Sequence, residues 1–226
     1  MNPSEEFYLS KLYPLQDDVL KTISFAGTPF YLTGGTVIGR VYCWHRYSDD
    51  LDLFINHDSE FENHFKAIVN ILKEKFIIED NVSYDTFARI FIAGNDFKLK
   101  VEFVNDVKYR VGEVTNHEVF GKIDTWFNIL VNKLTATTRN AAKDFSDILF
   151  LSYKYSFNWQ DVISEMKKKD AWLDEVKVAE NIDRFDISKF DQVNWIVQPD
   201  FDKLGKDLIV IAKDILLGND NSLYKG

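Results

Sequence analysis

The chain contains few of the residues that cross-link or interrupt a fold. Among 226 residues there is one cysteine, Cys43, with four prolines and ten glycines. A single cysteine excludes a disulfide within the chain and is typical of a reducing compartment, so we expect a cytoplasmic protein. Because glycine and proline interrupt regular structure, their scarcity favours long helices and strands joined by short loops.

Long apolar runs and strongly basic segments are also missing. No stretch reaches the ~18 consecutive apolar residues of a membrane-spanning helix. The N-terminal residues lack the charged-then-apolar pattern of a secretion signal, so we expect no membrane partner. The formal net charge is −9 and is spread over both halves of the chain. This charge argues against a protein that coats nucleic acid passively, and an RNA substrate would need a local basic groove.

The spacing of apolar residues divides the chain into two parts. Segments with helical and strand-like spacing are mixed up to about residue 115, and only helical spacing follows from about residue 121. The predicted strands are 30–35, 50–55, 76–80, 87–94 and 98–104. We therefore predict an α+β fold, with a small mixed-sheet domain over residues 1–115 and a helical domain over residues 116–226.

The first chemical motif is Gly34-Gly35-Thr36, followed after a spacer by Asp50-Leu51-Asp52. Residues two apart on a strand point to the same face, so Asp50 and Asp52 project together. Two adjacent carboxylates repel each other unless a cation lies between them, and Mg²⁺ prefers such oxygen ligands together with substrate phosphates. The two glycines let a phosphate approach the backbone closely, and the Thr36 hydroxyl adds a hydrogen-bond donor.

A third carboxylate, Glu102, lies in the strand-like segment 98–104. If this strand pairs beside 50–55, Glu102 points the same way as Asp50 and Asp52. It would then complete a site for two Mg²⁺ ions or accept the proton of an attacking hydroxyl. The combination predicts transfer of a phosphoryl or nucleotidyl group.

These residues carry a resemblance to a known family. The stretch from the Gly-Gly-Thr turn to Asp50-Leu51-Asp52 resembles motif I of the DNA polymerase β-like nucleotidyltransferase superfamily. With His45-Arg46-x-Ser48 before the aspartates, it is similar to the AbiEii/AbiGii-type nucleotidyltransferase toxins. The resemblance implies a nucleoside triphosphate (NTP) substrate, an RNA acceptor such as tRNA, and a cognate antitoxin as partner.

The resemblance continues in a second block that runs from Lys133 to Asp147. It implies that Lys133, as a point charge, and Arg139, through paired hydrogen bonds, hold the triphosphate. Asp144 is expected to orient one of these two cations. Lys143 and Asp147 stand four residues apart on a helix and also fit an exposed ion pair.

Two residues of the loop before Asp50 leave alternatives open. Arg46 fits either a phosphate contact or an ion pair with an aspartate, and Ser48 fits either a phosphate contact or a hydrogen bond within the turn. His45 and Arg40 have no role that the sequence decides.

Two other functions remain open at this stage. One is nucleotidyl transfer to a small cationic molecule of the aminoglycoside kind, which an acidic acceptor pocket would favour. The other is a non-catalytic nucleotide-binding or interaction protein, which the loss of a carboxylate would have favoured. Because Asp50, Asp52 and Glu102 are all present, we predict a magnesium-dependent enzyme that moves a nucleoside monophosphate (NMP) from an NTP to an acceptor hydroxyl.

Overall fold

The computed structural model describes residues 3–226 and divides them into two compact units. The first unit runs up to Val37 and from Tyr47 to Thr125, and the second comprises Ile38–Arg46 and Trp126–Gly226. The predicted division at residue 115 is therefore displaced, and the short segment 38–46 belongs with the later part of the chain. Within the described residues, no helix is both long and apolar enough to cross a membrane.

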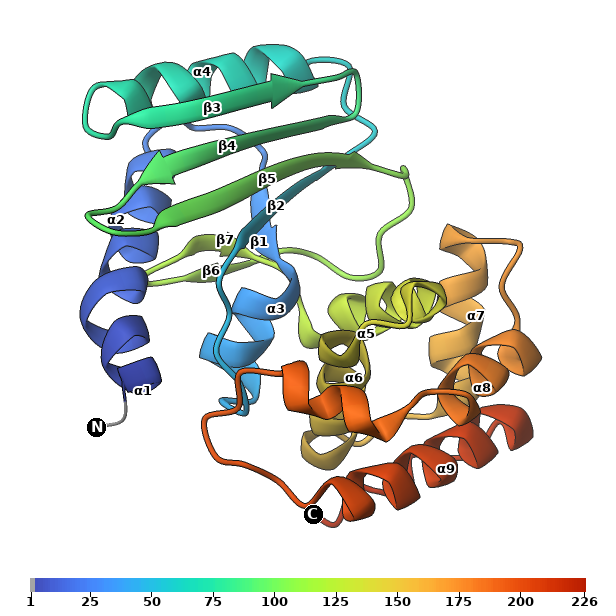
Figure 1. Cartoon of the computed structure of the whole chain (residues 1–226). Coiled ribbons are helices and arrows are strands. Elements are labelled where there is room, and N and C mark those ends of the chain that lie inside the picture. Colours follow the sequence, from blue (N-terminus) through green and yellow to red (C-terminus); the bar gives the residue numbers. More distant parts are fainter. Residues whose placement is uncertain (1–2) are drawn as a thin grey trace. The chain divides into compact units, whose positions relative to one another are not determined.

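The first unit is built around a mixed sheet in the order β3-β4-β5-β2-β1-β7-β6 (Figure 1). Its strands are β1 (Tyr31–Thr33), β2 (Leu51–Asn56), β3 (Ile78–Ser83), β4 (Phe87–Ala93), β5 (Lys98–Asp106), β6 (Thr115–His117) and β7 (Gly121–Ile123). The predicted strands 30–35, 50–55 and 98–104 therefore lie in one sheet, as the spacing indicated. The prediction missed the β6–β7 hairpin, because three-residue strands carry too little alternation to be detected.

Strand β2 runs parallel to β5 and antiparallel to β1, while β4 is antiparallel to both β5 and β3. A turn that includes residues 94–96 joins β4 to β5, and the Gly94 N–H donates to the carbonyl of Phe97. The central strands β2 and β5 thus each have a hydrogen-bonded neighbour strand on both sides. This pairing fixes the register of the residues along both strands.

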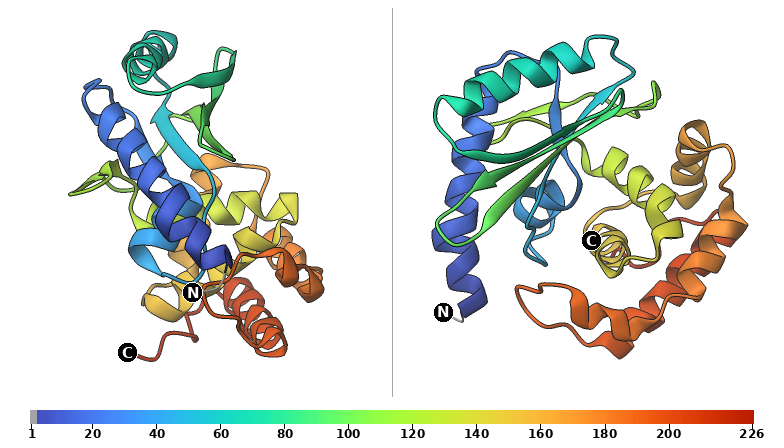
Figure 2. Two further views of the ribbon diagram at one scale, coloured as in Figure 1. Left: turned by 60° about the vertical axis from the view of Figure 1, so that its left-hand side comes forward. Right: turned by 45° about the horizontal axis from the view of Figure 1, so that its top comes forward.

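Two helices cover one face of this sheet, α2 (Tyr13–Ser24) and α4 (Phe61–Lys73), and Figure 2 shows both on the same side. The ring of Phe65 on α4 lies 5.1 Å from that of Phe103 on β5. Along β2 buried and half-buried residues alternate, with Leu51, Leu53 and Ile55 facing the helices. The intervening residues of each central strand therefore face the opposite, open side of the sheet.

Short helical segments join these elements. They are α1 (Pro3–Phe7), a π-helical turn over Tyr8–Leu12, α3 (Gly34–Val37) and a second π-helical turn over Ile38–Tyr42. Helix α3 begins directly after β1. The chain therefore passes from strand to helix at Gly34 without an intervening loop.

From Trp126 onward the second unit is built of helices, so the helical region begins later than the predicted residue 116. Its helices are α5 (Trp126–Thr135), α6 (Ala142–Lys154), α7 (Trp159–Lys169), α8 (Glu175–Asp183) and α9 (Phe201–Leu217), with 3-10 turns at Ala136–Arg139 and Ile187–Gln192. The side chains of Asn158, Asp174 and Asp200 accept backbone N–H groups at the starts of α7, α8 and α9. Fully buried rings such as Trp159, Phe145 and Phe190 form its core.

Candidate active site

The open face of the sheet brings the predicted carboxylates onto adjacent strands. In the parallel register of β2 and β5, Asp52 lies directly beside Glu102. Both residues are half-buried, whereas their neighbours Leu51, Leu53, Val101 and Phe103 are buried under the helices. Asp50 comes directly before the first residue of β2. The alternation predicted from the sequence therefore places the acidic side chains on the face that the helices leave uncovered.

A lysine that the sequence analysis did not select lies among these acids. Lys100 Nζ is 2.9 Å from Asp50 Oδ2 and 3.3 Å from Glu102 Oε1. Burial alone would lower the pKa of Lys100, but its hydrogen bonds to the two carboxylates and their charges raise it above the ordinary value. The signal was present in the sequence, because Lys100 is two residues before Glu102 and must share its face of the strand.

Gly34 is required for two physical reasons. Its φ of +70° lies in the left-handed region, which residues with a side chain rarely adopt. A Cβ atom at this position would lie 2.6 Å from Asp52 Oδ2. The backbone at the end of β1 thus approaches the Asp52 carboxylate closely, and this carboxylate fills the space that a side chain at Gly34 would need.

Thr36 and Ser48 make hydrogen bonds within the segment just before Asp50. Thr36 Oγ1 lies 2.5 Å from the carbonyl oxygen of Asp50 and 3.1 Å from Ser48 Oγ, and both residues are buried. The carbonyl oxygens of Ser48 and Asp49 in turn accept hydrogen bonds from the side chain of Gln16. Of the two roles open for Ser48, the hydrogen bond within the turn is the one observed. These contacts fix the chain just before Asp50.

The donor set fits a divalent cation. Asp50, Asp52 and Glu102 supply only carboxylate oxygens, the ligand type that Mg²⁺ prefers. Asp50 and Glu102 already hold a cation between them, the ammonium group of Lys100. Within residues 3–226, no group of three or more His, Cys, Asp or Glu side chains is arranged as a ready metal site. The ammonium group of Lys100 occupies the space between the Asp50 and Glu102 carboxylates.

The second predicted block forms a buried ion cluster within the second unit. Asp147 is fully buried and accepts hydrogen bonds from Arg46 Nε at 2.7 Å and Arg46 Nη2 at 2.8 Å. His45 Nε2 lies 3.1 Å from the same carboxylate, and Lys133 Nζ lies 2.6 Å from it. Burial alone would raise the pKa of Asp147, but the charges of Arg46 and Lys133 hold it well below the ordinary value.

Lys133 and Arg139 share the second aspartate of this cluster. Lys133 Nζ is 2.7 Å from Asp144 Oδ1, and Arg139 Nη2 is 2.9 Å from Asp144 Oδ2. Only 9% of the Lys133 side chain is exposed, compared with 63% for Arg139. Asp144 therefore contacts both cations, whereas the sequence analysis expected it to orient one of them. The ammonium group of Lys133 already has two anionic partners, so a phosphate would be its third.

One expectation is corrected here, for Asp147, and one alternative left open is decided, for Arg46. Asp147 is not the exposed partner of Lys143 but a fully buried residue at the centre of the cluster. Of the two roles open for Arg46, the ion pair with an aspartate is the one observed, and Arg46 is itself buried. The sequence could not show this pairing, because Arg46 and Asp147 are 101 residues apart.

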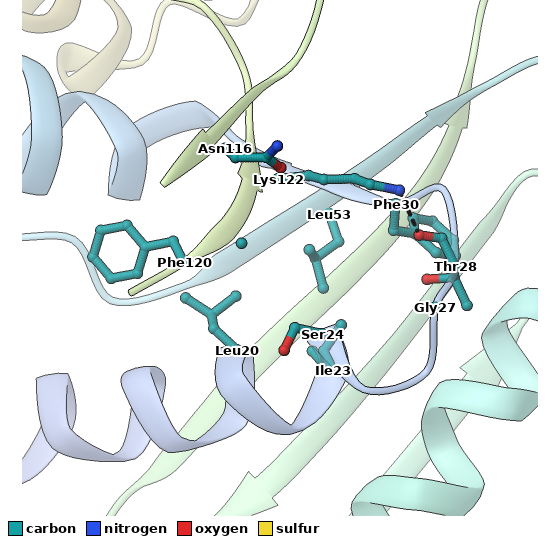
Figure 3. A pocket seen from close by; sticks show the side chains of 11 residues that line it. Leu20, Ile23, Ser24, Gly27, Thr28, Phe30, Leu53, Asn116, Phe120 and Lys122 are labelled. Carbon is teal, nitrogen blue, oxygen red and sulfur yellow. Dashed lines mark hydrogen bonds between the residues drawn. The ribbon is translucent and has the colours of Figure 1, made fainter. Parts of the chain in front are cut away.

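A separate cavity of about 220 Å³ lies in the first unit between α2, β2 and the β6–β7 hairpin (Figure 3). Its lining includes Leu20, Leu53 and Phe120, and the Lys122 ammonium donates to the carbonyl of Thr28 beside it. Leu53 points to the helix-covered side of β2. The cavity therefore lies on the face of the sheet opposite to the carboxylates.

Comparison with known families agrees with the motif pattern. The family model for the nucleotidyl transferase AbiEii toxin of type IV toxin–antitoxin systems matches residues 18–207. The chain belongs to this family. The resemblance inferred from the two sequence blocks is thereby confirmed, and the AbiEii-family match spans both structural units. No curated protein shows a significant match.

Two solved structures share the fold of this AbiEii-family chain. The crystal structure of JHP933 from Helicobacter pylori matches with a TM-score of 0.57 at 21% identity, covering 88% of this chain and 89% of that one. A second H. pylori structure, provisionally described as a nucleotidyltransferase, matches with a TM-score of 0.57 at 24% identity, covering 89% and 93%. At these identities the similarity establishes the fold alone.

Proposed function

We propose that this chain is a magnesium-dependent nucleotidyltransferase that moves an NMP from an NTP to a hydroxyl group of an RNA acceptor, with tRNA as one candidate. The observation that carries the proposal is the set of three carboxylates on the open face of the sheet, with a cation already held between Asp50 and Glu102. The family assignment adds the setting of a toxin with an antitoxin partner.

Asp50, Asp52 and Glu102 are the residues that would hold two Mg²⁺ ions. The ions would neutralise charge on the triphosphate and on the leaving pyrophosphate. Gly34 and Gly35 would let the phosphates approach the backbone, and Gly34 already lets the backbone approach the Asp52 carboxylate, which a side chain there would overlap. In the reaction, the acceptor oxygen forms a bond to the α-phosphorus, the bond to pyrophosphate breaks, and the acceptor proton passes to a base such as Glu102.

The cations of the second unit belong to the same proposal. Arg139 suits a phosphate contact because its side chain is mostly exposed and its guanidinium group already lies on the carboxylate of Asp144, which orients it. Lys133 is assigned to a phosphate contact from the family resemblance, and within the second unit Asp144 and Asp147 hold its ammonium in place. Arg46 is assigned to supporting Asp147, since its guanidinium group is buried against that carboxylate.

The test is a transfer assay with each of the four α-³²P-labelled NTPs, total RNA and Mg²⁺. We expect label from at least one NTP to enter RNA, and Asp52→Asn to reduce the rate by at least about 10²–10³-fold. Arg184→Ala is the control, because Arg184 is an exposed residue of the second unit. Absence of labelled RNA with all four NTPs, or an Asp52→Asn variant as active as the control, would reject the assignment.

A further inference from the structure

The open face of the sheet continues past Glu102 onto β4. Phe87, Arg89 and Phe91 are half-buried and alternate with the buried residues Ala88, Ile90 and Ile92. In the antiparallel register of β4 and β5, Arg89 lies directly opposite Glu102. Directly opposed residues on paired strands point to the same face. Arg89 therefore lies on the same open face as the carboxylates.

Arg89 has no anionic partner within the described part of the chain, residues 3–226. Its guanidinium carbon lies over the Phe91 ring, 5.3 Å from the ring centre, in a cation–π contact. Its Nε atom is buried and has no hydrogen-bond partner. An arginine normally uses its donors on carboxylates, phosphates or carbonyl groups, and a buried donor without a partner is costly. Arg89 is therefore poised to bind an anion that is not part of the protein.

The order of the strands indicates which anion this is. Across the sheet, the register places Thr33 of β1, Asp52 of β2, Glu102 of β5 and Arg89 of β4 in one row. Gly34, where the triphosphate is proposed to lie, follows Thr33 at one end of the row. Arg89 stands at the other side of the carboxylates, roughly 10 Å from Asp52 at the usual strand spacing. An acceptor that attacks from the side of Glu102 would reach Arg89.

We propose that Arg89 binds a backbone phosphate of the acceptor RNA strand and thereby holds the attacking hydroxyl near Glu102. The inference rests on the proposed nucleotidyl transfer, and it assigns binding of the acceptor RNA to strand β4. A guanidinium group binds a phosphodiester through paired hydrogen bonds, which a lysine cannot reproduce. The same positive charge disfavours a cationic small molecule as acceptor. Arg89 thus selects for a polyanionic acceptor.

The first measurement is the affinity for a 12-nucleotide oligouridylate that carries fluorescein at its 5′ end. Fluorescence anisotropy measures this affinity at several salt concentrations. Arg89→Ala is expected to weaken binding about tenfold. The slope of log affinity against log salt should become shallower by about 0.7, as for one lost phosphate contact with a single strand. Arg89→Lys should restore the slope but only part of the affinity.

The control variant is Lys98→Ala, which removes one positive charge from the neighbouring strand. Lys98 is exposed and paired with Glu79, so its loss should leave the salt slope unchanged. Thermal melting of all variants checks the fold, and Arg89→Ala should melt close to the wild type because it breaks no ion pair. An Arg89→Ala variant that binds the oligonucleotide like Lys98→Ala would overturn the inference.

The second measurement separates the acceptor from the nucleotide. Binding of a non-hydrolysable α,β-imido NTP in the presence of Mg²⁺ should be the same for Arg89→Ala and the wild type. In the transfer assay, the KM for RNA should rise about tenfold while the KM for NTP stays constant. Weaker NTP binding with unchanged RNA binding would reject the acceptor role. If the wild type transfers no label but Arg89→Ala still weakens oligonucleotide binding, the proposed reaction fails while the phosphate contact stands.

Discussion

The ammonium group of Lys100 lies 2.9 Å from Asp50 Oδ2, and the same nitrogen lies 3.3 Å from Glu102 Oε1. One side chain of β5 thus holds together two carboxylates that would otherwise repel each other. In the proposed enzyme, a bound metal would compete with the ammonium group of Lys100 for the same carboxylate oxygen atoms.

The first prediction concerns this competition. Lys100→Met should lower the free energy of unfolding of the metal-free protein by about 1 kcal/mol, because the carboxylates lose their counter-charge. The same variant should bind Mg²⁺ or Mn²⁺ more tightly than the wild type, since no ammonium has to be displaced. Calorimetric titration and melting with and without metal measure both effects. Lys98→Met is the matched control on β5, and equal metal affinity in both variants would contradict the idea.

The second prediction uses two glycines with similar backbones. Gly34 has a φ of +70° and Gly27 a φ of +63°, but only a Cβ at Gly34 would meet another group, Asp52 Oδ2 at 2.6 Å. Gly34→Ala and Gly27→Ala should each cost about 1–2 kcal/mol of stability from the left-handed backbone. Only Gly34→Ala should also displace Asp52 and abolish transfer. Equal activity of the two variants, measured with labelled NTP, would show that the close approach to Asp52 is unimportant.

The third prediction concerns the buried cluster. Asp147→Asn removes the charge that neutralises Arg46 and Lys133, both of which are buried. Leaving such cations unpaired should destabilise the protein by about 3–5 kcal/mol in chemical denaturation. Lys143→Ala, an exposed position one turn earlier on α6, should change stability by less than about 0.5 kcal/mol. Similar losses in the two variants would contradict the central role of Asp147.

The fourth prediction is a pH dependence that originates at His45. Burial lowers the pKa of His45 and outweighs the opposing hydrogen bond to Asp147, so the ring is neutral in the fold. Its Nε2 lies 3.1 Å from Asp147 Oδ1, while Nδ1 is buried and has no hydrogen-bond acceptor among residues 3–226. Protonation of the ring would therefore place a buried N–H donor at Nδ1 with no acceptor. In the unfolded chain a histidine titrates near pH 6.5.

Below about pH 6.5 the unfolded chain therefore binds a proton that the folded protein does not, and stability falls as the pH is lowered. His45→Gln should lose this contribution and show a flatter stability profile between about pH 7 and pH 5. Urea denaturation at each pH measures the difference. A profile of His45→Gln that runs parallel to that of the wild type would show that folding does not lower the pKa of His45.

Much of the carboxylate face was predictable from the sequence because a strand alternates with a period of two residues. In the segments that became β2 and β5, every second residue is apolar, and this pattern alone separates Asp52 and Glu102 from the core. The glycine pair and the aspartate pair also identified the family through their order and spacing. Lys100 and Arg89 obey the same alternation, but a lysine or arginine on an open face is common and gave no reason to select it.

The pairings between distant segments were decided only by the tertiary structure. Alternation fixes which face a side chain takes, but not which residue lies opposite it. A shift of β5 along β2 by two residues would keep both faces and still separate Asp52 from Glu102. The β6–β7 hairpin and the assignment of residues 38–46 to the second unit likewise depend on packing partners far along the chain. The sequence by itself thus determined the chemistry of the carboxylates and the face they occupy. The register that aligns Asp52, Glu102 and Arg89, and the burial that joins Arg46 to Asp147, arise from contacts that no local pattern encodes.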